Sequence, residues 1–132
     1  MLNEVNKGII NLLKANNNAF ITALSGRLFY DEAPNDTTPY CVFSYNEIPS
    51  QDSEDEYLTI DLQFSFYDSN SSVERLGNII KECKKIFNDC ESRLVIDGWA
   101  VISVIETRAV NLGKVNRAEH DVATYIVELQ KQ

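Results

Sequence analysis

The sequence has 132 residues, of which 44% are hydrophobic, and a net charge of −8. This length predicts one domain over residues 1–132, with enough apolar residues to form a core. No apolar stretch reaches the roughly 18 residues that a membrane span needs, and the first residues lack the pattern of a signal peptide. We therefore expect no membrane association and a protein that stays in the cytoplasm of the cell that makes it.

The negative charge is concentrated in the middle of the sequence. Residues 28–74 include eleven acidic residues and no lysine or arginine, whereas the rest of the chain carries a small positive excess. Phosphate binding requires lysine and arginine, so the middle of the chain is a poor nucleic-acid-binding surface. The cysteines, Cys41, Cys83 and Cys90, form no C-x-x-C pair, and we expect buried thiols rather than disulfides or a zinc site.

A helix is expected at the start of the chain. Apolar residues recur at helical spacing from Leu2 to Leu13, and the asparagines at 16–18 can end the helix because asparagine tolerates a left-handed cap conformation. One or two further helical turns are expected over residues 19–24.

Two short strands are expected next, at residues 28–30 and 40–45, which are rich in aromatic and β-branched residues. The loop between them contains Pro34 and Pro39. Neither proline can donate a hydrogen bond to a sheet, and each pushes the preceding residue towards extended geometry. This loop is therefore expected to be stiff, open and outside the sheet.

Residues 57–67 form the clearest expected strand, because apolar and polar residues alternate along them. The S-x-x-E pattern from Ser71 to Glu74 then predicts the start of a long helix. The stripe of this helix that is expected to pack on the sheet consists of Val73, Leu76, Ile80, Cys83 and Phe87.

The last third of the chain predicts two more strands, at 99–108 and 121–129. The dipeptide Asp97-Gly98 indicates a hairpin turn before the first of them. The connection over residues 110–120 exceeds a usual hairpin loop, so we expect a long functional arm that carries Lys114 and Arg117.

Candidate catalytic and metal-binding residues are few. His120 next to Asp121 could be drawn as a base and its orienting carboxylate, but neighbouring strand residues usually point apart, and the sequence offers no nucleophile in an identifiable setting. The acidic run from Asp52 to Glu56 could be drawn as a cation site, but it lacks the glycine and the alternating carboxylates of a calcium loop. We therefore predict no enzymatic activity, no catalytic residue, no metal and no cofactor.

The order of features resembles the tail terminator and tail completion proteins of long-tailed bacteriophages, including the head-to-tail joining type. The matching features follow the N-terminal helix: Gly26-Arg27-Leu28-Phe29, Ala33-Pro34, Pro39-Tyr40 running into Cys41-Val42-Phe43, the alternating strand that ends in Phe66-Tyr67-Asp68, the helix from Ser72 and the two closing strands. The resemblance extends from about Leu12 to Leu129. This sequence has phenylalanine at Phe66, near where the family often has tryptophan, and this departure affects packing more than role.

The resemblance implies an α+β fold: a mixed, mostly antiparallel twisted sheet, with the N-terminal helix and a second long helix packed on one face. It also implies a structural virion protein, assembled in the cytoplasm of a bacterial host and located at the junction of tail and neck. Six copies would form a ring that caps the tail tube protein, ends tail polymerisation and meets the head connector. DNA would pass through the lumen of the ring without specific binding.

Two surfaces are candidates for these contacts. The loop with Pro34 and Pro39, or the acidic loop with Asp52, Glu54, Asp55 and Glu56, is expected to face the neighbouring subunit or the lumen. The arm with Lys114 and Arg117 is expected to dock on the tail tube or the connector. Two alternatives stay open: a head–tail adaptor or neck protein, and, in a different class, a module that binds a small ligand or a peptide.

Overall fold

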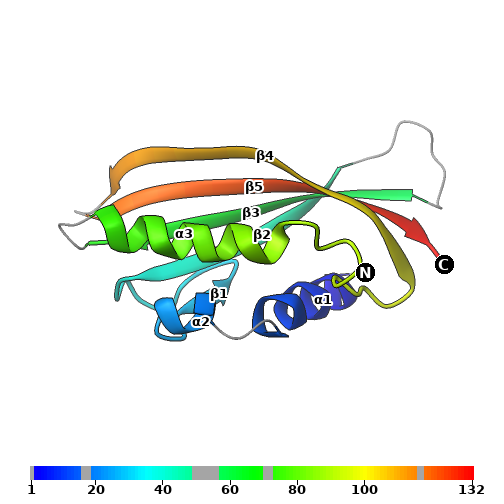
Figure 1. Cartoon of the computed structure of the whole chain (residues 1–132), viewed down its shortest axis with the longest axis horizontal. Coiled ribbons are helices and arrows are strands. Elements are labelled where there is room, and N and C mark those ends of the chain that lie inside the picture. Colours follow the sequence, from blue (N-terminus) through cyan, green and yellow to red (C-terminus); the bar gives the residue numbers. More distant parts are fainter. Residues whose placement is uncertain (1, 16–18, 49–56, 70–72, 116–117) are drawn as a thin grey trace.

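The computed structural model describes residues 2–15, 19–48, 57–69, 73–115 and 118–132. The elements in chain order are helices α1 (Leu2–Ala15) and α2 (Ala19–Ala23), strands β1 (Leu28–Tyr30), β2 (Tyr40–Ile48) and β3 (Tyr57–Asp68), helix α3 (Val73–Phe87), and strands β4 (Trp99–Val115) and β5 (Ala118–Lys131) (Figure 1). The expected α+β class is confirmed. None of the described helices is long and apolar enough to cross a membrane.

The described strands form one sheet in the order β1-β2-β3-β5-β4. β1 lies parallel to β2, and the other neighbouring strands are antiparallel. The expectation of a mixed, mostly antiparallel sheet is therefore confirmed. The long strand β3 lies at its centre, paired with β2 on one side and β5 on the other, and β1 and β4 form the two edges.

One face of the sheet is apolar and is covered by the helices (Figure 1). β3 places Ile60, Leu62, Phe64 and Phe66 on this face, each at most 1% exposed, as the alternating sequence predicts. Apolar side chains on alternate positions of a strand drive this burial, because only one face of an amphipathic strand gains from leaving water. β3 therefore supplies the centre of the core.

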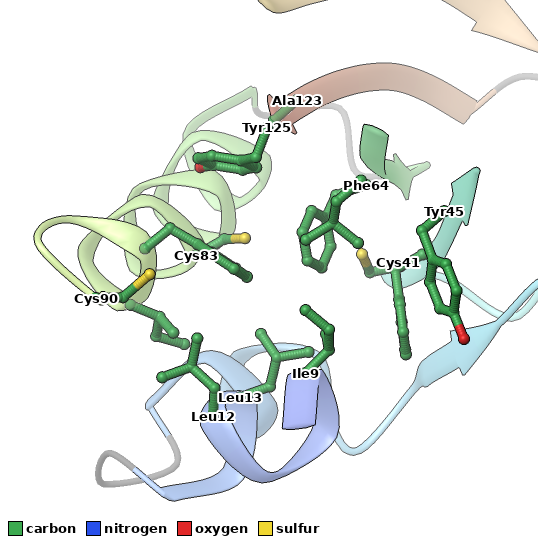
Figure 2. Packing of buried hydrophobic residues seen from close by; sticks show 14 of the residues in the cluster. Ile9, Leu12, Leu13, Cys41, Tyr45, Phe64, Cys83, Cys90, Ala123 and Tyr125 are labelled. Carbon is green, nitrogen blue, oxygen red and sulfur yellow. The ribbon is translucent and has the colours of Figure 1, made fainter. Parts of the chain in front are cut away.

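The helices complete the core from the other side. Leu12 and Leu13 of α1 point into the same buried cluster as Phe64 and Cys41 of the sheet and Cys83 of α3 (Figure 2). Phe87 of α3 stacks on Tyr125 of β5, with ring centroids 4.6 Å apart. The expected packing of α1 and α3 on one face is thus confirmed.

The buried side of α3 differs in part from the expected stripe. Leu76, Cys83 and Phe87 are buried as predicted, but Val73 is 71% exposed. Ile79 and Ile86 are buried instead. Ile80 is only half-buried, because it lies on the flank of α3 that faces β4.

A charged pair joins the start of α3 to the end of β3. Asp68 is 1% exposed, and the Arg75 guanidinium donates to it in a bidentate ion pair, with Nε 2.7 Å from Oδ2. The expected capping box cannot be checked, because Ser71 lies outside the described residues. The described anchor of this helix is therefore a buried carboxylate that the sequence analysis did not single out.

The prediction of a long loop over residues 110–120 is wrong. β4 continues to Val115 and β5 begins at Ala118, with Asn111 opposite Asp121 and Lys114 opposite Glu119. Gly113 has a φ of 87° and donates its N–H to the Asn111 side chain at 2.9 Å, next to a register shift. The asparagine and glycine that suggest a loop in the sequence form a β-bulge inside a long hairpin.

The turn at Asp97-Gly98 is present, but only part of the expected hairpin forms. Gly98 has a φ of 84°, and Ile96 and Trp99 form an isolated bridge rather than two paired strands. Trp99 is partly buried at the start of the edge strand β4, where it packs against the core.

Candidate interaction surface

The second face of the sheet is polar, and no described helix covers it (Figure 1). On β2 and β3 this face alternates with the core positions, so it carries Tyr40, Val42, Ser44, Gln63, Ser65 and Tyr67. An uncovered sheet face with this composition is available for contact with another molecule.

The loop between β1 and β2 is fixed at both ends. The Asp31 N–H donates to the Phe43 carbonyl at 2.9 Å, which closes the loop onto β2. At the other end the Arg27 guanidinium donates to the Pro39 carbonyl at 2.8 Å and the Thr38 carbonyl at 3.1 Å. The Thr38 hydroxyl also lies 2.5 Å from that of Ser69. The loop stays outside the strands, as expected, and is held in place.

This loop overhangs the polar face and forms a concavity of about 460 Å³. Its wall carries the exposed acidic residues Asp31, Glu32 and Asp36, and its floor carries Gln63 and Ser65. No lysine or arginine is among the described residues that line it. The concavity, which we call the acidic concavity, therefore favours a cationic occupant.

Stacked aromatic rings border the acidic concavity. Tyr40 stacks on Tyr67 with ring centroids 4.7 Å apart, and Tyr67 stacks on His120 at 4.3 Å. Burial, the neighbouring Tyr67 and the Asp36 carboxylate, in that order, raise the pKa of Tyr40. Its phenol is therefore neutral at pH 7.

His120 serves as a stacked ring in this arrangement. Its side chain lies with Tyr67, whereas the adjacent Asp121 lies on the helix-covered face opposite Phe66. Burial lowers the pKa of His120, although the nearby Asp121 carboxylate raises it. Asp121 accepts a hydrogen bond from Asn111 rather than from the imidazole. The two residues point apart, as the sequence analysis expects.

The opposite edge of the sheet carries positive charge. Arg108 and Lys114 of β4 are exposed, and neither forms an ion pair with a described carboxylate. Glu119, which is directly opposite Lys114, accepts a hydrogen bond from Asn111 at 3.1 Å instead. Arg108, opposite Thr124, lies on the polar face of the sheet, whereas Lys114, opposite Glu119, lies on the helix-covered face.

The backbone of β4 is partly protected against pairing with another strand. Glu91 accepts a hydrogen bond from the Val104 N–H at 3.2 Å. Three register shifts interrupt the pairing of β4 with β5. Charged side chains and bulges on an edge strand disfavour the addition of a further strand.

A second hollow of about 650 Å³ lies between α3 and β4. Lys84 of α3 lies 3.4 Å from Glu106 of β4 across it, and its lining includes Lys81, Asp89 and Glu91. Because its lining carries both positive and negative side chains, some of them paired, this hollow favours neither a cationic nor an anionic ligand. The sequence analysis did not identify it, since it joins residues far apart in the chain.

The candidate residues of the sequence analysis have separate locations. Pro34 is exposed in the loop that overhangs the acidic concavity, and Pro39 is buried at its end. Lys114 lies on β4 rather than in a loop. The acidic run Asp52 to Glu56, with its possible cation site, and Arg117 lie outside the described residues.

The thiols are buried as expected. Burial raises the pKa of Cys41 and Cys83 well above the ordinary value, and that of Cys90 to about 11. Such thiols stay protonated and unreactive at pH 7. Among the described residues, no three histidine, cysteine or acidic side chains gather where they could hold a metal ion.

Comparison with known proteins finds the same fold in solved structures. No protein-family profile and no curated protein sequence matches this chain. A chain in the structure of the virion of a native gene transfer agent particle superposes with a TM-score of 0.75 at 13% sequence identity. The match covers 92% of this chain and 91% of that one, so the two share the whole fold.

Proposed function

We propose that this chain is a structural subunit of a phage-like particle, and that its role is that of a tail terminator. Copies of the chain form a ring, with six as the expected number, that caps the tail tube and ends its polymerisation. The other side of the ring meets the head connector. The observation that carries the proposal is the near full-length fold shared with a chain of a gene transfer agent virion.

The surfaces of the molecule support a role as a ring subunit. A ring requires an interface in which one patch meets a different patch on the next copy. The acidic concavity over β2 and β3 and the exposed cations of the edge strand β4 are unlike surfaces of one sheet. The role needs no catalytic group, metal or cofactor, and it locates the protein at the tail–neck junction of the particle.

The acidic character of residues 28–74 also suits an open lumen. DNA that passes through a ring must slide without binding, and carboxylates repel its phosphates. We propose that the loop with Pro34 and Pro39, or the acidic run from Asp52 to Glu56, faces the neighbouring subunit or this lumen. Arg117, together with Lys114, remains a candidate contact with the tail tube or the connector.

The test is deletion of the gene in the bacterium that carries the particle genes, followed by electron microscopy of the particles. Loss of a terminator leaves tails of uncontrolled length that are not joined to heads. Tails of normal length beside filled, tailless heads indicate a neck adaptor instead. Normal particles refute a structural role and favour a ligand-binding module, for which the hollow between α3 and β4 is the first place to search. Restoration of the gene on a plasmid is the control.

A further inference from the structure

We propose that the hollow between α3 and β4 is a binding site for a small neutral molecule that combines an apolar body with a carbonyl group. The group that recognises the carbonyl oxygen is the hydroxyl of Tyr125. The volume of about 650 Å³ lies in the usual range of small-molecule sites. This inference goes beyond the proposed function and does not depend on it, because a ring subunit needs no ligand at this position.

The hydroxyl of Tyr125 is the polar anchor of this site. Tyr125 is 3% exposed and lines the hollow, and its hydroxyl has no hydrogen-bond partner among the described residues. In Figure 2 this hydroxyl points away from Phe64, towards the side of α3. A buried hydroxyl without a partner costs free energy, and a ligand that accepts its hydrogen bond removes that cost.

The hydroxyl is a donor at neutral pH. Burial is the first cause that raises the pKa of Tyr125, and the nearby Cys83, Glu106 and Cys90 raise it further. The phenol therefore keeps its proton at pH 7 and can donate it to an acceptor. A carbonyl oxygen is such an acceptor and carries no charge into the hollow.

The hollow has apolar walls in fixed positions. Phe87 stacks on Tyr125 with ring centroids 4.6 Å apart, and Ile80 and Val104 also line the hollow. Phe87 is 3% exposed and lies 5.2 Å from the ring of Phe64 in the core. Because the two stacked rings are held by the core, they keep their orientation without a ligand, which lowers the entropy cost of binding. An apolar body that packs on them leaves water.

Charged side chains in the lining disfavour an ionic ligand. Lys84 lies 3.4 Å from Glu106 across the hollow. Lys85 pairs with Glu82 at 3.2 Å, and Glu91 accepts a hydrogen bond from the backbone of β4. An anion in the hollow meets two of these carboxylates, and a cation meets two of these ammonium groups, so part of the lining repels either of them. A neutral ligand avoids both penalties.

Access to the hydroxyl requires the opening of one exposed ion pair. Glu106 is directly opposite Tyr125 in the pairing of β4 with β5, so the pair of Lys84 and Glu106 lies next to the tyrosine. The two side chains of the pair are 42% and 41% exposed. An ion pair with this exposure contributes little free energy, so a ligand can separate it at little cost.

The test compares three probes of nearly the same shape: benzamide, benzoate and benzamidine, which are neutral, negative and positive at pH 7. Each is titrated into the isotopically labelled chain, and binding is followed by the shifts of assigned amide signals. We expect saturable shifts from benzamide at residues 77–88, 104–106 and 125, with a dissociation constant on the order of 1 mM. Benzoate and benzamidine should each bind at least about fivefold more weakly, because part of the lining repels them.

A pair of tyrosine variants tests the anchor. Tyr125→Phe removes the hydroxyl and keeps the ring, so it should weaken benzamide binding about fivefold, the effect of one neutral hydrogen bond. Tyr45→Phe is the matched control, because Tyr45 is a buried tyrosine of the same core that does not line the hollow. It should leave binding unchanged. Circular dichroism establishes that both variants are folded.

A third variant keeps the test decisive if Tyr125→Phe does not fold. K84M/E106Q removes the exposed ion pair and leaves the buried rings in place. It should bind benzamide at least as tightly as the unmodified chain, because the charges play no part in recognition of a neutral ligand. Loss of benzamide binding in this variant would show that the charges hold the ligand and would overturn the proposal.

Three further outcomes would overturn the site. They are the absence of saturable shifts from benzamide, shifts centred on another part of the chain, and equal binding of benzamide by folded Tyr125→Phe and the unmodified chain. Tighter binding of benzoate or benzamidine than of benzamide would contradict the neutral class of ligand. These results are separate from the deletion experiment, which reports on the shape of particles.

Discussion

Gly8 lies where α1 touches the segment that follows α3. A Cβ at this position would lie 2.5 Å from the Val95 carbonyl oxygen and 2.9 Å from the Ile96 side chain. Backbone atoms cannot move aside as a flexible side chain can, so the glycine permits a close approach of two segments that are distant in the sequence. The absence of a side chain at Gly8 therefore allows α1 to pack closely against this segment.

We predict that Gly8→Ala lowers the free energy of unfolding by about 1–2 kcal/mol, because the cost of overpacking exceeds the gain of about 1 kcal/mol in helix propensity. Urea denaturation measures the change. Gly77→Ala is the matched control, because Gly77 is an exposed residue in α3 with nothing within 4 Å of an added Cβ. It should stabilise the protein by about 0.5–1 kcal/mol. Equal effects at both glycines would contradict the close approach.

Among the elements, α3 depends on the ion pair between Asp68 and Arg75. Asp68 is buried, whereas the side chain of Arg75 is 44% exposed. The carboxylate therefore depends on its partners for charge compensation, while the guanidinium can still be hydrated. Loss of the carboxylate charge weakens the link between β3 and α3.

We predict that Asp68→Asn lowers the free energy of unfolding by about 1–3 kcal/mol, the range for a disrupted hydrogen bond to a charged group. Glu82→Gln is the control, because it removes the exposed pair between Glu82 and Lys85 at 3.2 Å and should cost less than about 0.5 kcal/mol. Thermal unfolding compares the two. A loss at Asp68 no larger than that of the control means that the pair has no structural role.

The elements that could be predicted from the sequence are those whose pattern is local. β3 shows its alternation over consecutive residues, and the structure follows it. The hairpin of β4 and β5 could not be predicted near Gly113, because a glycine with positive φ can belong to a turn or to a bulge. A bulge forms here because Asn111 pairs with Asp121 and Lys114 pairs with Glu119. Such pairing joins two separate strands and cannot be recognised from the residues around Gly113 alone.

The acidic concavity shows the same limit at the level of the site. Its acidic residues and the unusual loop were visible in the sequence, and Pro34 and Pro39 correctly marked a segment outside the sheet. Its floor comes from β2 and β3, so its shape depends on the fold. The exposed position of Arg108 at an edge of the sheet could not be predicted either, because it depends on the order of strands across the sheet.

The free energy of unfolding of the whole molecule should decrease at alkaline pH, because ionisable groups from several elements are buried in their neutral form. The pKa is raised for Cys41, Cys83, Cys90, Tyr45 and Tyr125. In the unfolded chain thiols ionise near pH 8.5 and phenols near pH 10. Below pH 8.5 both states are protonated and the stability is fully present. As the pH rises further, ionisation favours the unfolded chain.

We predict that the free energy of unfolding falls from about pH 8.5 towards pH 11, by roughly 1 kcal/mol per buried thiol at one pH unit above its ordinary pKa. Urea denaturation at pH 7, 8.5 and 9.5 measures the slope. Cys90→Ala should reduce it, since the pKa of Cys90 is raised to about 11. Constant stability up to pH 9.5 would show that the thiols are accessible to water.

The carboxylate of Glu91 on the Val104 amide, together with the bulges of β4, has a consequence for how copies of this chain meet. Backbone pairing between edge strands is insensitive to sequence and can continue without limit, as in fibrils. Where the backbone is blocked, neighbours recognise each other through side chains, and such contacts can separate and form again until the geometry is right. In the ring that we propose, errors in assembly would therefore stay reversible until the last subunit closes the circle.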